Sequence, residues 1–225
     1  MSHALAALWK PVFVTVAALL PIVNPLGTAP IFLSVSADLP AAAQRRLAWQ
    51  VARNATLLLA GAMLVGSHVL DFFGISLPIV RVGGGLLVTA NGWRLVNADD
   101  TARPKSEMPV REAWDREIAS RAFYPLTFPL TVGPGSISIA ITLGARVAGR
   151  GTSKLIDLLV DLVGVAIIGF IVHMCYRFAS RLIAALGETG TTVFLRLSAF
   201  ILLCVGVAIV WSGVEELITP LLSHR

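Results

Sequence analysis

Charged residues are scarce in this sequence and are missing altogether from long parts of it. Only 14% of its 225 residues are Asp, Glu, Lys or Arg, against roughly 25% in an average soluble domain. Residues 11–37, 54–70, 122–145 and 197–214 contain none of them. Uncharged stretches of roughly 17 or more residues are long enough to cross a bilayer. These gaps exclude an ordinary soluble globular protein and predict a polytopic membrane protein.

Cysteine and the familiar catalytic motifs are also sparse or missing. The chain has two cysteines, Cys175 and Cys204, which lie in apolar segments without the spacing of metal ligands, so we expect buried, reduced thiols. It contains no HExxH, GxSxG, phosphate-binding loop or zinc-ligand spacing. We therefore predict no enzyme activity, no catalytic residues, no metal site and no prosthetic group.

Six apolar segments remain once the polar connections are set aside. We expect each to be a helix, because lipid offers no partners for the backbone groups of an open sheet edge. The first is too long for the apolar region of a signal peptide, so we expect the N-terminus to be retained. A polar connection at 97–121, with a short surface helix at about 110–121, divides one transmembrane domain over 1–225 into halves at about 10–96 and 122–215. The six predicted spans are 11–36, 54–73, 75–96, 122–145, 155–176 and 197–214.

A proline pattern near the start of each half indicates a repeat. Three spans per half is an odd number, so a tandem duplication places the second copy upside down in the membrane. Inverted repeats with interrupted helices are a recurring architecture of secondary transporters. The fold class is therefore predicted as all-α, with six transmembrane helices in two inverted three-helix repeats and broken first and fourth helices. Pro21, Pro25, Leu26 and Pro30 recur 104 residues later as Pro125, Pro129, Leu130 and Pro134.

The basic residues predict the orientation in the membrane. Twelve Lys and Arg residues fall on the side of the first, third and fifth connections, and five on the other. The positive-inside bias then puts both termini outside the cytoplasm. It also explains the net charge of +5 better than nucleic-acid binding does, since the basic residues lie between spans and not in one patch.

The proline and glycine residues of the first and fourth spans predict a break in each helix. We expect Thr28 to cap a second half-helix, which leaves the amides of residues 27–29 free as a partly positive terminus. Two such breaks facing each other suit a small solute that carries a carboxylate and an ammonium group. The alternative is a pair of proline kinks that only shape packing. The predicted substrate-binding residues are Asn24, Pro25, Gly27, Thr28, Thr131, Gly133, Gly135 and Ser136.

Three ionisable residues inside the spans form a second candidate site. Arg81 and Asp161 lie at similar depth, so we expect them to pair, and Asp157 shares a helix face with Asp161. Unpaired charges are costly in a bilayer, by about 2.5 to 3.5 kcal/mol each on insertion scales. Arg81, Asp157 and Asp161 are thus predicted to form a gate or coupling site, with a purely structural pair as the alternative. The neighbouring run Gly83-Gly84-Gly85 predicts close helix contact.

Three motifs in this order resemble the MarC family of bacterial inner-membrane proteins, over about residues 10–215. The motifs are Asn24-Pro25-Leu26-Gly27 followed by Pro30, residues 73–78 leading to Arg81 and the glycine run, and Pro129-Leu130 followed by residues 133–135. The resemblance implies six spans, kinship with the LysE-type transporter group, and transport of small neutral amino acids. The sequence departs from the family pattern after the second break, where Gly135 is followed by Ser136 and Ile137. A hydroxyl role there can shift to Ser138.

We therefore predict a secondary transporter of small neutral amino acids or similar zwitterions, working by alternating access in the bacterial inner membrane. Its expected partners are a small-molecule solute and the lipid bilayer, with no nucleic acid. A proton or sodium gradient is the expected driving force, and self-association to a homo-oligomer is left open. One alternative is a translocase of an anionic lipid head group. The other is a non-transporting membrane partner or regulatory protein.

Overall fold

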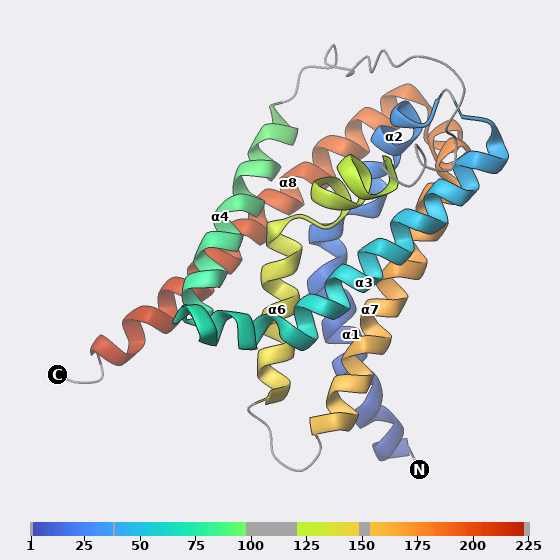
Figure 1. The fold of residues 1–225 in the computed structure, drawn as a ribbon. Coiled ribbons are helices and arrows are strands. Elements are labelled where there is room, and N and C mark those ends of the chain that lie inside the picture. Colours follow the sequence, from blue (N-terminus) through green and yellow to red (C-terminus); the bar gives the residue numbers. More distant parts are fainter. Residues whose placement is uncertain (1, 38, 98–120, 149–153, 223–225) are drawn as a thin grey trace.

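The chain folds as a bundle of helices. The computed structural model describes residues 2–37, 39–97, 121–148 and 154–222, and within these ranges it contains no strand. The surface helix expected at about 110–121 falls outside them, except for Arg121. The elements are α1 (Ser2–Val23), α2 (Pro25–Val35), α3 (Ala41–Phe73), α4 (Leu77–Val96), η1 (Ala122–Thr131), α6 (Pro134–Ala148), α7 (Lys154–Arg177) and α8 (Ala179–Leu222) (Figure 1).

Three of the described helices are long and apolar enough to cross a membrane, namely α3, α7 and the part of α8 from Thr189 to Thr219. Two bent pairs also qualify: α1 with α2, bent by 43°, and η1 with α6, bent by 70°. If each pair is one span, the described residues hold up to five. The six predicted spans are therefore confirmed in part. The remaining predicted span, at 75–96, is the helix α4, whose hydropathy Arg81, Asn91 and Arg94 reduce.

The helices pack into two connected groups. The broken pairs α1–α2 and η1–α6 lie against α3 and α7, while α4 and α8 pack side by side along much of their length. The N-terminal end of α1 and the C-terminal end of α8 lie at one end of the bundle, and the C-terminal end of α4 lies at the other (Figure 1). The outer ends of the first and last described helices thus lie at the same end of the bundle.

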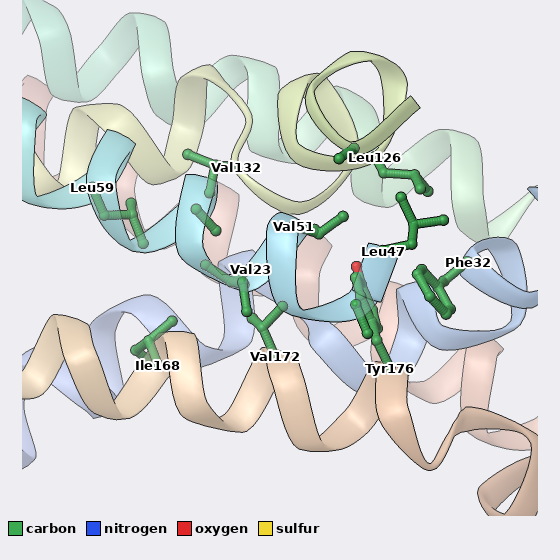
Figure 2. Close-up of a cluster of buried hydrophobic side chains, with 14 of the residues drawn as sticks. Val23, Phe32, Leu47, Val51, Leu59, Leu126, Val132, Ile168, Val172 and Tyr176 are labelled. Atoms are coloured by element: carbon green, nitrogen blue, oxygen red, sulfur yellow. The ribbon is translucent and has the colours of Figure 1, made fainter. Parts of the chain in front are cut away.

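The core lies where the broken pairs meet α3 and α7. Figure 2 shows Leu47 and Val51 of α3 facing Val172 and Tyr176 of α7, with Phe32 of α2 beside them. Large apolar side chains on the outside, such as those of Phe13, Phe72, Phe170 and Trp211, are exposed. Packing complementarity stabilises such a bundle, because lipid is as apolar as the core itself.

Neither cysteine is fully buried, although Cys175 packs against the edge of this core. Cys175 is half-buried and Cys204 is exposed on α8, so the prediction that both are buried is wrong. The reason is that apolar segments of a membrane protein face lipid as well as the interior. Sequence hydropathy alone does not distinguish these two environments.

Glycines let α4 approach two neighbours closely. A Cβ atom on Gly85 would lie 2.8 Å from the backbone nitrogen of Val210 in α8, while one on Gly84 would overlap Ser138 of α6. Gly83, by contrast, has nothing within 4 Å of the corresponding position. The close helix contact predicted from this glycine run is thus confirmed at Gly84, which faces α6, and at Gly85, which faces α8.

Candidate functional site

The first helix break lies at Asn24, between α1 and α2. Asn24 is in the left-handed conformation (φ 42°, ψ 56°), which asparagine tolerates better than most residues. Its side-chain Oδ1 accepts a hydrogen bond from the Gly27 amide at 3.2 Å, and Pro25 occupies the first turn, where its missing amide costs little. A Cβ on Gly27 would lie 2.8 Å from the Asn24 Cγ, so only glycine fits beneath this cap.

This geometry corrects the predicted position of the cap. Asn24 caps the second half-helix, not Thr28, so the cap lies four residues earlier than expected. The Thr28 amide donates to the Asn24 carbonyl at 3.1 Å, so the amides of Gly27 and Thr28 are bonded and not free. Asn24 is the better cap because its side chain reaches the amide three residues further on, while its left-handed backbone turns the chain.

The second break bends the chain more strongly, by 70° against 43° at the first. In η1, Tyr124 and Phe128 are extended, as residues that precede proline tend to be. The segment is a π-helix, and the hydroxyls of Thr127 and Thr131 donate to the carbonyls five residues earlier, at 2.6 Å each, so both side chains bond back to their own segment. The chain then turns at Val132 and resumes as α6.

The two breaks meet at Tyr176 of α7. Its phenol oxygen lies 2.8 Å from the Thr28 hydroxyl of the first break and 2.8 Å from the Thr131 hydroxyl of the second. All three side chains are buried, with exposed fractions of 2% for Tyr176, 8% for Thr28 and 1% for Thr131. The Tyr176 ring stacks on Phe32 of α2, with ring centres 4.6 Å apart and planes 15° apart (Figure 2). One phenol thus links the two halves of the chain.

No motif or spacing in the sequence predicted a role for Tyr176. The available signal was its rarity, because the chain has only two tyrosines and this one stands inside an apolar run. A hydroxyl within a membrane span needs a protein partner, since lipid supplies none. That argument marks Tyr176 as a residue of interest without naming its partners, which come from elements far away in the sequence.

The remaining predicted residues of the second break point elsewhere. A Cβ on Gly135 would overlap Val88 of α4, so this glycine serves helix contact. Ser138 donates to the Val80 carbonyl of α4 at 2.9 Å, which ties α6 to α4. Ser136 is buried at the start of α6. Gly133 lies in the turn that precedes α6.

The predicted pairing of Arg81 with Asp161 is wrong. Arg81 is buried in α4, and its guanidinium pairs with Glu216 of α8, which is about half exposed. Asp161 of α7 is also buried and accepts a hydrogen bond from the Thr15 hydroxyl of α1 at 2.8 Å. Depth along a helix did not decide the partner, because α4 packs against α8 through their glycines.

Asp157 is half-buried in the first turn of α7, one turn before Asp161. The three ionisable residues thus do not form one cluster around Arg81. Among the described residues, no group of three or more His, Cys, Asp or Glu side chains has the arrangement of a metal site.

Comparison with known proteins now places the chain. A model of the MarC family of integral membrane proteins matches residues 9–218. The chain belongs to this family. The inner membrane protein MarC of Salmonella typhimurium is 30% identical over 215 residues, which cover 94% of this chain and 97% of that protein. The same-named protein of Escherichia coli strain SMS-3-5 is 30% identical over 217 residues with the same coverage. No solved structure matches the chain.

The match confirms the resemblance predicted from the three motifs. It extends over nearly the whole chain and so includes both helix breaks, Arg81 and Tyr176. The names of the MarC relatives place them in the inner membrane, in keeping with the exposed apolar surface of this family member.

Proposed function

We propose that this protein is a secondary transporter that carries small neutral amino acids or similar zwitterions across the bacterial inner membrane by alternating access. The observation that carries the proposal is the meeting of two helix breaks, one from each half, at a buried polar cluster around Tyr176. Paired breaks at the interface of two repeats are where secondary transporters of several folds bind their solutes.

The packing of the helices supports six crossings in two inverted halves. In such a fold, the main contacts of first-half elements with the second half recur with the roles exchanged, and those of this chain do so except for α1 with α8. Here α1 packs on α7 and η1 on α3, α2 packs on α7 and α6 on α3, and α2 packs on α8 and α6 on α4. The second helices of the halves, α3 and α7, pack on each other, and so do the third helices, α4 and α8.

The chemistry of the cluster favours a solute without net charge. Thr28, Thr131, Tyr176 and Asn24 are all neutral, and each both donates and accepts hydrogen bonds. A zwitterion offers donors and acceptors close together and adds no net charge to the low-dielectric interior. An anionic lipid head group would instead require a cationic partner, and the described hydrogen bonds of this cluster include none.

The buried charged groups supply a route for coupling to an ion gradient. Ionisable groups inside a membrane commonly mark ion or proton pathways. Asp161 with Thr15 joins α1 to α7, and Arg81 with Glu216 joins α4 to α8, so each pair links the two halves. We assign a gate or coupling role, with protons or sodium, to Arg81, Asp157 and Asp161, and add Glu216 to this set.

Counterflow into proteoliposomes tests the transport function. Vesicles loaded with unlabelled glycine, alanine or serine should accumulate the same labelled amino acid faster than protein-free vesicles. Labelled lysine and glutamate serve as charged controls and should not exchange. If none of the neutral amino acids exchanges under a proton or a sodium gradient, the proposed function fails.

Thiol labelling tests the proposed orientation, in which both termini lie outside the cytoplasm. Arg45 in the second turn of α3 and Thr219 in the last turn of α8 are both exposed and belong to opposite ends of the bundle. A membrane-impermeant maleimide added to intact cells should label the Thr219→Cys variant and not the Arg45→Cys variant. The reverse pattern would contradict the orientation.

A further inference from the structure

We propose that the Tyr176 hydroxyl is an internal latch, which holds the solute-free protein closed and is displaced when the solute's own polar groups reach Thr28 and Thr131. The identity of the solute rests on the proposed function, whereas the latch itself rests on geometry alone. Three features of the site carry the inference: where the phenol is bonded, what holds its ring, and how strong its bonds are.

The phenol connects elements that alternating access has to separate. Thr28 belongs to α2 in the first half, Thr131 to η1 in the second half, and Tyr176 to α7. A path to the breaks from either side of the membrane requires these elements to part. Since both bonds pass through one oxygen atom, one movement of Tyr176 releases both breaks.

The ring is held in a closed position. It stacks on Phe32 of α2 with its centre 4.6 Å away, and the whole side chain is 2% exposed. Thr28, Thr131 and Phe32 are buried with it, so the phenol fills the space between the breaks in this conformation. A solute reaches the two threonines only after the ring leaves.

The strength of the bonds indicates which ligands can displace the phenol. Its two hydrogen bonds join neutral groups, whereas an ammonium or carboxylate makes hydrogen bonds roughly twice as strong. A zwitterion therefore outcompetes the phenol for the two threonines. A neutral polyol only matches it. The latch thus selects for charged groups in a solute that has no net charge.

Alkylation of a buried cysteine tests the latch without requiring transport. Val132 lies at the second break, is fully buried and is close to cysteine in volume. The reporter is Val132→Cys in a chain with Cys175→Ala and Cys204→Ala, treated with a membrane-permeant maleimide in the absence of solute. Tyr176→Phe removes both bonds and should speed alkylation by about five- to thirtyfold. Thr28→Val removes one of the two bonds to the phenol, so its alkylation rate should lie between the rate of the reporter alone and that of Tyr176→Phe.

The order of the variants provides the decisive comparison. The double variant Tyr176→Phe/Thr28→Val should react no faster than Tyr176→Phe, because the phenol is already gone. Two control variants of the reporter should be alkylated at the same rate as the reporter alone. Tyr124→Phe deletes the hydroxyl of the other tyrosine, a residue that is 68% exposed. Thr142→Val deletes a buried hydroxyl that, within the described residues, donates only to a carbonyl of its own helix. If Tyr176→Phe reacts at the rate of these controls, the latch is refuted.

A transport measurement then separates the two proposals. Opening the latch raises the fraction of binding-competent protein, so the KM for glycine should fall by up to the same factor as the alkylation rate rises. If the parent protein exchanges no amino acid, the proposed function fails while the alkylation rates still decide the latch. If Tyr176→Phe does not fold, as judged by gel filtration, Thr28→Val alone decides it, and an unchanged rate overturns the inference.

Discussion

Replacing Gly92 by alanine should destabilise the protein, while the same replacement at Gly83 in the same helix should not. A Cβ on Gly92 would lie 2.6 Å from the backbone nitrogen of Leu203 and 2.7 Å from its Cα. Ordinary contact begins at 3.4 Å, so α4 and α8 would have to move apart by roughly 0.8 Å. The obstacle is backbone, which cannot turn away as a flexible side chain can.

The magnitude follows from two opposing terms. Alanine in place of glycine favours a helix by up to about 1 kcal/mol, and this gain applies at both positions. Overpacking costs typically about 1 to 3 kcal/mol and applies only at Gly92, since Gly83 has nothing within 4 Å. The two variants should therefore differ by about 2 kcal/mol, which corresponds to roughly 4 to 8 °C in Tm for a chain of this size.

Thermal unfolding in detergent, followed by intrinsic tryptophan fluorescence, measures this difference. Gly83→Ala should melt at or above the temperature of the parent protein, and Gly92→Ala below it. A third variant, Gly206→Ala, approaches the same interface from α8, where its Cβ would meet the backbone of Thr89. If Gly92→Ala and Gly206→Ala both have the same Tm as Gly83→Ala, then α4 and α8 do not pack as described.

Two further substitutions test the charged pair and the first cap. Glu216→Gln should lower the free energy of unfolding by about 2 kcal/mol, which is less than for a fully buried pair because Glu216 is half exposed. The control Glu215→Gln, at the adjacent exposed residue, should change the Tm little. Equal effects of the two substitutions would mean that Arg81 does not depend on Glu216. Asn24→Ala should cost about 2 kcal/mol, from the lost cap and the left-handed backbone, and Asn24→Gly only a few tenths. A glycine variant as unstable as the alanine variant would contradict this account.

The sequence was informative wherever a local rule decides the structure. Proline and glycine placed both breaks in the correct segments, because a missing amide and a missing Cβ act on the backbone directly. The prediction that Thr28 is the cap was wrong by one turn. It required comparing two nearby caps, and the left-handed conformation of Asn24 becomes visible only in the folded chain.

No pattern in the sequence predicted which residues far apart in the chain would contact each other. Tyr176 joins residues that precede it by 148 and 45 positions, and no spacing rule connects them. Arg81 was paired with Asp161 by counting residues from span ends, but α8 continues to Leu222, past the predicted end at 214. That extension brings Glu216 to Arg81, and it could not be recognised from an apolar run that stops at Val214.

The shared phenol also imposes a direction on the site. Tyr176 has one proton and two hydroxyl neighbours, so it donates to one threonine and accepts from the other. If Thr28 donates to the phenol, Thr131 is free to donate to the Leu126 carbonyl; if the order is reversed, Thr28 donates to the Asn24 carbonyl instead. Thr28 and Thr131 therefore cannot both donate to their own backbone at once while the phenol donates to one of them and accepts from the other. The position of a single hydrogen atom thus makes the two breaks unequal.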